Sequence, residues 1–385
     1  MEARDKEKHL WKMLCVLGLV GLISVVTAKD PIGVCVLMTL SFFSNTSYSV
    51  TSRSGTRNSA LFHAIAVIAS NVVFYAVLNR LVTNNLSLAL FIPYTVATVW
   101  GSFAGATFSQ RIEEQFGITT SNEKPTTEEE KRRAKLAKKA LLSLLAVLII
   151  CLFVFARNLP FVLLLTLIGA KFVNEASFSL LRRARNASSP IYHIFVILVN
   201  STTWFLLFKF LAENQMSPVL FWPYCFGSVL GSLAGQDVSS RIENMIGASV
   251  DAHLNIDQPW YKFIPYKFVA ILGLVSALLL AKSGSPLSIM GLLIFAAGQQ
   301  MAFTMVSRSR NRNSMTYHVI ASIFSNGVWF LTFRQVNSVE WTLASYAPYS
   351  TGSAMGSITG AGVSMGIEKA LNITSDLKKP AQKTA

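Results

Sequence analysis

Arg53-Ser-Gly-Thr-Arg57-Asn58-Ser59-Ala-Leu-Phe62-His63 is the first of three related stretches in this chain. The other two read Arg183-Ala-Arg185-Asn186-Ala-Ser-Ser189-Pro-Ile-Tyr192-His193 and Arg308-Ser-Arg310-Asn311-Arg312-Asn313-Ser314-Met-Thr-Tyr317-His318. Each histidine precedes a Pro-Tyr pair by 30 residues and a glutamate by 50; these are Pro93-Tyr94, Pro223-Tyr224 and Pro348-Tyr349, then Glu113, Glu243 and Glu368. Solenoid repeats are only about 20–50 residues long. Each copy, at 125 to 130 residues, is therefore expected to be a small domain.

The composition predicts that the lipid bilayer is one partner of the chain. Of its 385 residues, 52% are hydrophobic and only 14% are charged, and the mean hydropathy is +0.46. A transmembrane helix needs about 20 mostly apolar residues, and each copy offers four such stretches. The twelve predicted spans are 11–28, 31–52, 60–79, 88–109, 140–156, 160–181, 190–211, 218–239, 264–281, 286–307, 315–334 and 342–364.

The basic residues predict the orientation of these spans. All but seven of the 34 Lys and Arg fall on the side that holds both termini. Cytoplasmic loops carry an excess of Lys and Arg, so both termini are predicted to be cytoplasmic, in an inner or plasma membrane. The same rule explains most of the net charge of +15. Nucleic acid is a possible partner on charge grounds, although it is not favoured.

An even number of spans per copy means that each copy begins and ends on the same side. Such copies are parallel and related by rotation about the membrane normal, and three of them close most simply into a ring. The predicted fold is an all-α polytopic membrane protein with twelve transmembrane helices, arranged as three parallel four-helix repeats with pseudo-threefold symmetry.

The connectors set the predicted domain boundaries. Residues 1–117, 140–247 and 264–385 form the three repeats, the last with a cytoplasmic tail. Residues 118–139 are a charged cytoplasmic connector, and 248–263 are a second connector. In the first connector, Thr127 precedes three glutamates and then three basic residues. This pattern is typical of a helix start, so we expect a helix that runs from there into the fifth span.

The second span of each copy is too polar to face lipid, where unpaired polar groups are costly. Its deepest strong polar side chains are Asn45, Glu175 and Gln300, and the third span adds Asn71, Asn200 and Asn326 at a similar depth. Polar groups that converge near the bilayer midplane are typical of a solute site or pore lining. Alternatively, they join helices by hydrogen bonds. The Gly101-x-x-x-Gly105 motif and its counterparts at Gly231 and Gly356 favour close helix packing.

Three charged residues inside predicted spans all belong to the second copy. Lys171 and Glu175 lie four residues apart in one span, and Asp237 lies in another. An intramembrane charge costs about 2.5–3.5 kcal/mol on insertion scales and marks a functional candidate. We therefore predict that Glu175, together with Asp237, binds substrate or couples transport to a proton, with Lys171 as ion-pair partner. The alternative is a Lys171–Glu175 pair that only fixes helix packing.

The arginine-rich stretches form a second candidate site. Arginine is the preferred planar donor to carboxylate and phosphate, so an anion-attracting vestibule at the cytoplasmic mouth is predicted; anchoring to lipid headgroups is the alternative. The predicted vestibule residues are Arg53, Arg57, Arg183, Arg185, Arg308, Arg310, Arg312, His63, His193 and His318. Three histidines about an axis can form a metal site, but structural hydrogen bonding is favoured here and no metal is predicted.

No cofactor or enzyme chemistry is predicted. The four cysteines fall within predicted spans without Cys-x-x-Cys spacing, which favours neither disulfides nor zinc. The sequence has no Walker loop and no nucleophile elbow with triad partners, so ATP-driven pumping and hydrolysis lack support. Loops opposite the termini are a few residues long, too short for a receptor ectodomain.

The sequence favours a transporter that moves a small polar or anionic solute along one central path between the three repeats. Two alternatives remain open. One is a membrane-embedded scaffold or anchor that recruits nucleic acid or an acidic protein at the arginine-rich face. The other is a passive channel.

Overall fold

The computed structural model describes residues 2–55, 59–83, 87–116, 128–184, 190–214, 216–246, 286–309, 314–338 and 342–371, with single positions at 270–278, 312 and 373. This part of the chain contains eleven α-helices. They are α1 (Glu2–Val26), α2 (Pro31–Ser54), α3 (Ala60–Thr83), α4 (Phe91–Phe116), α5 (Glu128–Phe155), α6 (Phe161–Ala184), α7 (Pro190–Glu213), α8 (Phe221–Ile246), α10 (Pro286–Ser309), α11 (Met315–Ser338) and α12 (Leu343–Ala370). Two short 3-10 helices, η1 (Leu88–Leu90) and η2 (Pro218–Leu220), lead into α4 and α8.

The helices agree with the predicted spans. Each predicted span within the described residues is helical along nearly its whole length, whereas the ninth, 264–281, lies mostly outside them. Six helices, α3 to α7 and α10, are long and apolar enough to cross a bilayer, and α1 adds a shorter apolar segment, Leu10–Val26. The described part of the chain is therefore that of an all-helical, multi-pass membrane protein. The count of twelve spans stays a prediction.

Local sequence signals set the helix starts. Proline is the first residue of α2, α7 and α10, a position where its missing N–H leaves nothing unsatisfied. Asp30 caps α2 by accepting a hydrogen bond from Gly33 N at 2.9 Å. The acidic run that begins at Glu128 forms the first turn of α5, where carboxylates interact well with the helix dipole. The helix expected from the first connector into the fifth span is thus confirmed.

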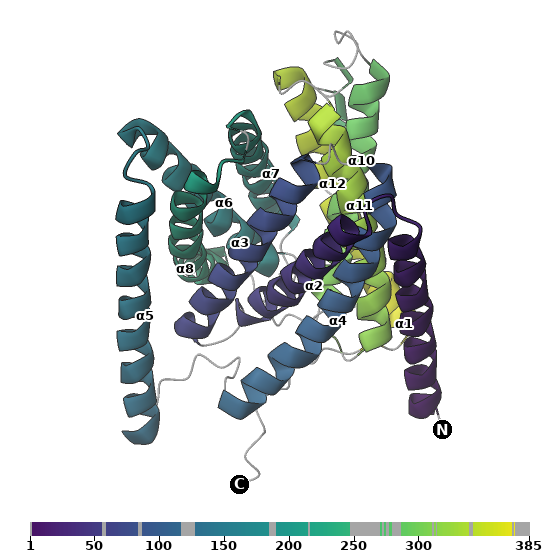
Figure 1. Ribbon diagram of the computed structural model, residues 1–385, viewed down its shortest axis with the longest axis horizontal. Coiled ribbons are helices and arrows are strands. Elements are labelled where there is room, and N and C mark those ends of the chain that lie inside the picture. Colours follow the sequence, from purple (N-terminus) through teal and green to yellow (C-terminus); the bar gives the residue numbers. More distant parts are fainter. Residues whose placement is uncertain are drawn as a thin grey trace.

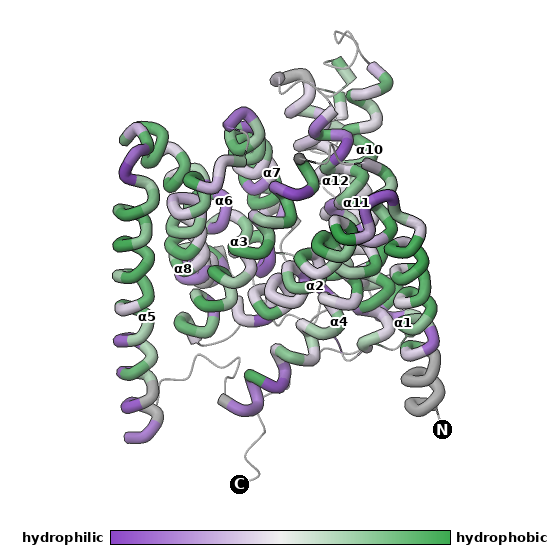
Figure 2. Tube along the Cα trace, viewed as in Figure 1, coloured by the Kyte–Doolittle hydropathy of each residue, from purple (hydrophilic) through white to green (hydrophobic). Residues whose placement is uncertain are grey.

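Two helices stand at the margins of the molecule. In Figure 1, α1 and α5 are upright at opposite sides, and the other helices lie between them. Figure 2 shows that α5 has a hydrophilic lower end and a hydrophobic upper part. Leu14 of α1 packs in one apolar cluster with residues of α4 and α11, and Leu148 of α5 packs with residues of α3 and α8. α1 therefore packs over the interface between α4 and α11, and α5 packs over the interface between α3 and α8.

Glycines bring three helix pairs close together. A Cβ atom added to any of the three would collide with a carbonyl oxygen of the facing helix: Gly101 with Phe42 O, Gly231 with Phe172 O and Gly356 with Ala297 O. The helix pairs are α2–α4, α6–α8 and α10–α12. The close packing predicted from the glycine spacing is confirmed, and it fixes which polar side chains of these helices can meet.

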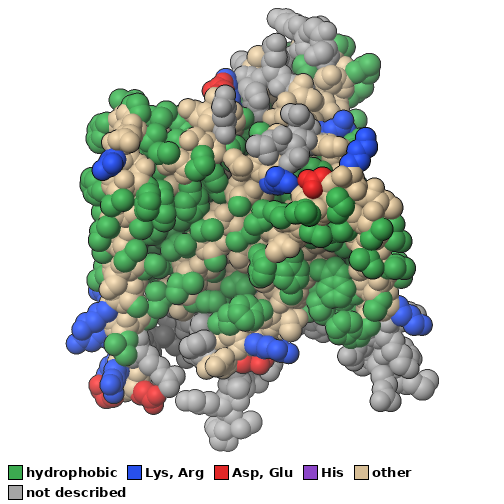
Figure 3. All heavy atoms as spheres, viewed as in Figure 1, with side chains coloured by type: hydrophobic (Ala, Val, Ile, Leu, Met, Phe, Trp, Pro, Cys, Tyr) green, Lys and Arg blue, Asp and Glu red, His purple; other side chains and the backbone are tan. Residues whose placement is uncertain are grey.

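The outer surface fits a bilayer. In the face shown in Figure 3, hydrophobic side chains cover the middle, while charged side chains gather along the upper and lower margins. Phe153 of α5 and Phe161 of α6 are 73% and 70% exposed. Large exposed apolar areas are rare on water-soluble proteins and mark interaction or membrane surfaces.

Gly356→Ala is expected to lower stability, because the added methyl group would meet the backbone of α10 and force the two helices apart. Overpacking of this kind costs about 1–3 kcal/mol. Thermal melting of the detergent-solubilised protein, followed by circular dichroism, should show a lower midpoint. Gly366→Ala on the same helix is the control, since no atom lies within 4 Å of its added Cβ. Equal losses in both variants would contradict the close contact.

Candidate functional site

Three histidines join helices that are distant in the sequence. Each shares a hydrogen bond between its Nε2 atom and a serine Oγ atom. The pairs are His63 with Ser232 at 2.6 Å, His193 with Ser357 at 2.8 Å and His318 with Ser102 at 3.2 Å. The first two bonds link α3 to α8 and α7 to α12. The third links α11 to α4, and so connects the last copy to the first.

These contacts give the histidines a structural role. All three are buried, and His63 and His318 also bind serines of the preceding helix through Nδ1, Ser54 at 2.8 Å and Ser309 at 3.0 Å. Each imidazole ring therefore contacts its own serine on the facing helix. Within the described residues, no group of three His, Cys, Asp or Glu side chains could hold a metal ion.

Three arginine–glutamate pairs lie near the C-terminal ends of the glycine-packed helices. In each, two guanidinium nitrogens reach one carboxylate, a strong and directional geometry. The shortest N–O distances are 2.9 Å for Arg53–Glu113, 2.5 Å for Arg183–Glu243 and 2.9 Å for Arg308–Glu368. A serine one turn earlier donates to the same carboxylate in each case: Ser109, Ser239 and Ser364.

These pairs limit what the predicted vestibule can offer an anion. The side chains of Arg53 and Arg308 are 6% and 4% exposed, and Arg312 also contacts Glu368 at 2.9 Å. The guanidinium groups therefore bind carboxylates of the protein itself. The remaining vestibule residues, Arg57, Arg185 and Arg310, lie outside the described residues, and the vestibule stays a prediction that rests on them.

Lys171 and Glu175 form an ion pair inside the helix assembly. Lys171 Nζ lies 2.5 Å from Glu175 Oε1, and the two side chains are 4% and 14% exposed. The ammonium group also lies 4.3 Å from the centre of the Tyr224 ring, which adds a cation–π attraction. The expected pair is present, while its role in coupling stays a prediction.

Asp237 lies apart from this pair. Its side chain is 63% exposed and pairs with Arg241 at 2.9 Å, one turn along α8. Exposed ion pairs at this spacing contribute little energy. The structure therefore does not bring Asp237 into the buried polar network, although the sequence placed it in the same candidate site.

The mid-span amides lie in different surroundings. Asn71, Asn200 and Asn326 donate to Ser228 Oγ on α8 at 2.8 Å, Ser177 Oγ on α6 at 3.2 Å and Ser322 O on α11 at 2.8 Å, respectively. Asn45 reaches Ser41 O at 3.5 Å, and Gln300 is buried on α10. The bonds of Asn71 and Asn200 fit the helix-joining alternative. Asparagines at the same or adjacent positions of the three copies thus make different hydrogen bonds.

An aromatic core lies at the opposite end of these helices from the arginine–glutamate pairs. Each tyrosine of a Pro-Tyr pair packs on an aromatic ring twelve residues after a histidine: Tyr224 on Tyr75 at 5.6 Å, Tyr349 on Phe205 at 5.7 Å and Tyr94 on Phe330 at 5.5 Å between centroids. Phe74–Trp329 and Phe208–Phe333 contacts then join α3 and α7 to α11. The sequence analysis missed this core, although the constant histidine-to-aromatic spacing signalled it. At the depth of these rings the centre of the helix assembly is packed, whereas the sequence predicted an open central path.

Arg182 is a further buried charge that the sequence analysis did not single out. Its Nη1 atom donates to Thr51 O on α2 at 3.0 Å, and its guanidinium lies 5.1 Å from the centre of the Phe178 ring. Gln236 of α8 donates to Gly55 O at 3.1 Å. Both side chains thus donate to carbonyl groups at the C-terminal end of α2, in addition to the helix's own bond from Gly55 N to Thr51 O at 3.1 Å. Within an arginine-rich stretch, Arg182 gave no signal that distinguished it from loop arginines.

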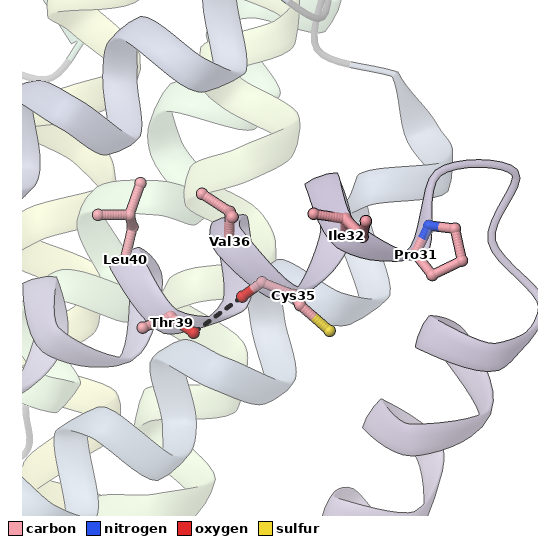
Figure 4. Close-up of a pocket in the computed structure, with 6 residues that line it drawn as sticks. All are labelled: Pro31, Ile32, Cys35, Val36, Thr39 and Leu40. Carbon is pink, nitrogen blue, oxygen red and sulfur yellow. Dashed lines mark hydrogen bonds between the residues drawn. The ribbon is translucent and has the colours of Figure 1, made fainter.

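A shallow hollow of about 400 Å³ lies on the outer face of α2. Figure 4 shows its lining residues, Pro31, Ile32, Cys35, Val36, Thr39 and Leu40. The Thr39 hydroxyl donates to Cys35 O of the same helix at 2.9 Å, and Ile32 is 78% exposed. This apolar surface is separate from the buried polar residues and suits contact with lipid.

Comparison of the chain with protein-family models, with curated proteins and with solved structures finds no match.

Glu113→Ala is expected to destabilise the protein strongly, because it removes the carboxylate from the buried Arg53 guanidinium. Breaking a buried ion pair from one side costs about 3–5 kcal/mol. Thermal melting in detergent measures the loss. Glu114→Ala is the matched control, because this neighbouring side chain is exposed. Similar midpoints for the two variants would show that the pair contributes little.

Glu368 lies beyond the predicted span 342–364 and is expected to make stability depend on acid pH. Burial raises the pKa of its carboxyl, but the Arg308 and Arg312 guanidinium groups and the Ser364 hydroxyl hold the net pKa below its ordinary value. A lowered folded-state pKa stabilises the protein above the unfolded-state value, about 4.3, and this contribution is lost as pH falls further. Melting midpoints measured from about pH 6 to about pH 3 should fall less steeply in Glu368→Gln. Parallel curves would contradict this contribution.

Proposed function

We propose that this protein is a secondary transporter that carries a small polar or anionic solute across an inner or plasma membrane. The observation that carries the proposal is the buried Lys171–Glu175 pair. Ionisable residues inside transmembrane helices are costly and mark solute paths and proton relays by default. The pair lies beside Tyr224, where the aromatic core meets the polar half of the assembly.

We further propose an architecture of three parallel four-helix units about a pseudo-threefold axis. Three kinds of contact recur at matching sequence spacing and support it: histidine with serine, arginine with glutamate, and Pro-Tyr tyrosine with an aromatic ring. The histidine–serine and tyrosine contacts join the same pairs of helices and connect the third unit back to the first. The positive-inside rule supports a cytoplasmic location for both termini.

The aromatic core favours a carrier over a passive channel. Rings such as Trp329 and Phe333, which stack at 5.0 Å, close the middle on the side away from the arginine–glutamate pairs. A solute can pass only if the units move relative to one another. In this proposal the aromatic core is the closed outer gate, and units rock about it to give alternating access. A channel would need a continuous opening through the same rings.

Glu175→Gln tests the coupling role in proteoliposomes loaded with a panel of labelled polar and anionic solutes. Neutralising a carboxylate that exchanges protons should lower uptake at least about tenfold and flatten its pH profile. Asp237→Asn is the matched control, since Asp237 is exposed and paired locally, and its uptake should equal that of the unmodified protein. An unchanged rate and pH profile in Glu175→Gln would remove the coupling role. Absence of flux for every solute in the unmodified protein would overturn transport itself.

A scaffold that recruits nucleic acid or an acidic protein has one observation in its favour. The first turns of α5 carry exposed basic side chains, including Lys131, Arg132, Lys135, Lys138 and Lys139. The affinity of binding through phosphate contacts falls steeply as the salt concentration rises. Steeply salt-dependent DNA binding by the purified protein, without solute flux, would favour this second function.

A further inference from the structure

α5 is the least covered of the helices that are long and apolar enough to cross a bilayer. Only 11% of its most apolar stretch is buried, compared with 50% for α3, α7 and α10. Leu141, Leu144, Leu145 and Leu148 pack with residues of α3 and α8. The helix stands upright at one margin of the molecule (Figure 1), so its other faces are open to the surroundings.

One open face of α5 is a stripe of large apolar side chains. Leu142, Ile149 and Phe153 are 58%, 40% and 73% exposed. Leu142 and Ile149 are seven residues apart and Phe153 lies one turn further on, and these spacings keep side chains on one side of a helix. An apolar area exposed in this way on a membrane protein contacts lipid chains. We call these three residues the α5 lipid stripe.

Basic residues continue the same face toward the start of the helix. Lys135 lies seven residues before Leu142, and Lys138 and Lys139 lie four and three residues before it. All three lysine side chains are exposed. The set that we call the α5 basic patch consists of these lysines and of two exposed residues one turn earlier, Lys131 and Arg132. The patch and the stripe thus share one side of α5, and Figure 2 shows the helix change from hydrophilic to hydrophobic along its length.

The basic patch lies at the depth of lipid headgroups. From Ala140 to Phe155 the helix rises about 23 Å, whereas the hydrocarbon core is about 30 Å thick, with a headgroup layer of about 5–8 Å on either side. Lys138 and Lys139 therefore lie at the edge of the hydrocarbon, and Lys131 lies about 12 Å further out than Lys139. Lysine stems run along apolar surface while their ammonium groups reach the headgroups. The positive groups thus extend through the headgroup layer of one leaflet.

Most of the patch lacks a counter-charge within the described part of the protein. Lys131 alone among the five has an ion-pair partner there, Glu128 at 2.6 Å, and both side chains are largely exposed. α5 contains no acidic residue after Glu130. The positive-inside rule needs only an excess of charge in a loop, whereas these charges are aligned on one face of a helix. Anionic headgroups of the adjacent leaflet would supply the missing counter-charge, because basic segments next to a transmembrane helix attract them.

We infer that the α5 basic patch is a binding site for anionic phospholipids of the leaflet at the N-terminal end of α5. The lysines hold the headgroup, and the α5 lipid stripe supports the acyl chains. This inference goes beyond the proposed transport and does not depend on it. Nucleic acid fits the patch less well, because the patch passes directly into a lipid-facing surface and a duplex would have to approach against the negative charge of the leaflet.

The test is native mass spectrometry of the full chain, titrated with phosphatidylserine or with phosphatidylcholine of the same acyl chains. Phosphatidylserine should bind at least about tenfold more tightly. The triple variant Lys135→Gln, Lys138→Gln, Lys139→Gln should lose this preference, since each basic residue near a membrane surface contributes about fivefold. Glutamine has a helix propensity close to that of lysine, so the melting midpoint should stay unchanged.

Arg157→Gln is the matched control, because Arg157 is an exposed basic residue just beyond the opposite end of α5. Its preference for phosphatidylserine should equal that of the unmodified protein. Glu128→Gln should act in the opposite direction from the triple variant. It releases Lys131 from its ion pair and should tighten phosphatidylserine binding by about twofold to fivefold.

An unchanged preference for phosphatidylserine in the triple variant would overturn the inference. An equal loss in Arg157→Gln would overturn it as well, since binding would then follow the net charge of the chain. Weaker binding in Glu128→Gln would contradict a site built on charge. Duplex DNA that binds the unmodified protein but not the triple variant, without a preference between the two lipids, would assign the patch to nucleic acid.

Discussion

A polar side chain inside a bilayer must find its partner within the protein, because lipid offers none. The rest of this structure depends on that constraint. The second helix of each unit brings serines and amides into the membrane and carries a buried arginine at its C-terminal end, and these groups are stable only when a second helix supplies acceptors or donors at the same depth. Arg53 with Glu113 and His63 with Ser232 are such matches. They fix the register of the helices more strictly than apolar packing does, since apolar contact is not directional.

Close backbone packing makes these matches geometrically available. Gly231 lets α8 approach the carbonyl oxygen of Phe172, and the same helix pair places Arg183 beside Glu243. At the other end the interhelical contacts are aromatic, as between Tyr94 and Trp329. The assembly therefore has a rigid, ion-paired polar half and a ring-packed half. Lys171 lies at the boundary between the two halves, over the Tyr224 ring.

Much of the fold could be predicted from the sequence because three copies reinforce one another. The Pro31 and Pro286 helix starts and the depth of each polar residue follow from counting along the chain. Counting cannot give the direction in which a side chain points. Arg53 and Glu113 were both recognised as repeated residues, yet their pairing across 60 residues was not expected. Asp237 shows the converse, because its depth suggested an interior charge while its face of α8 is exposed.

The aromatic core and Arg182 were missed for a related reason. Aromatic residues in an apolar span do not differ in hydropathy from those that face lipid, so only the constant spacing after each histidine distinguishes Tyr75 from Phe153. Differences between the copies depend on single substitutions, such as Ser201 in the place of Asn71. Repetition in a sequence predicts what the copies share. The effect of a residue that differs between copies can be inferred only once its neighbouring side chains are known.

The bond between Ser102 and His318 joins residues that are 216 positions apart. At translation rates of about 5–20 residues per second, roughly 10–40 s separate the synthesis of the two. During that interval α4 lacks its contact with α11, and α1, which packs on both α4 and α11, has only one of these two supports. The nascent chain therefore depends on another protein, such as an insertase, to shield the first helices until the last ones are made.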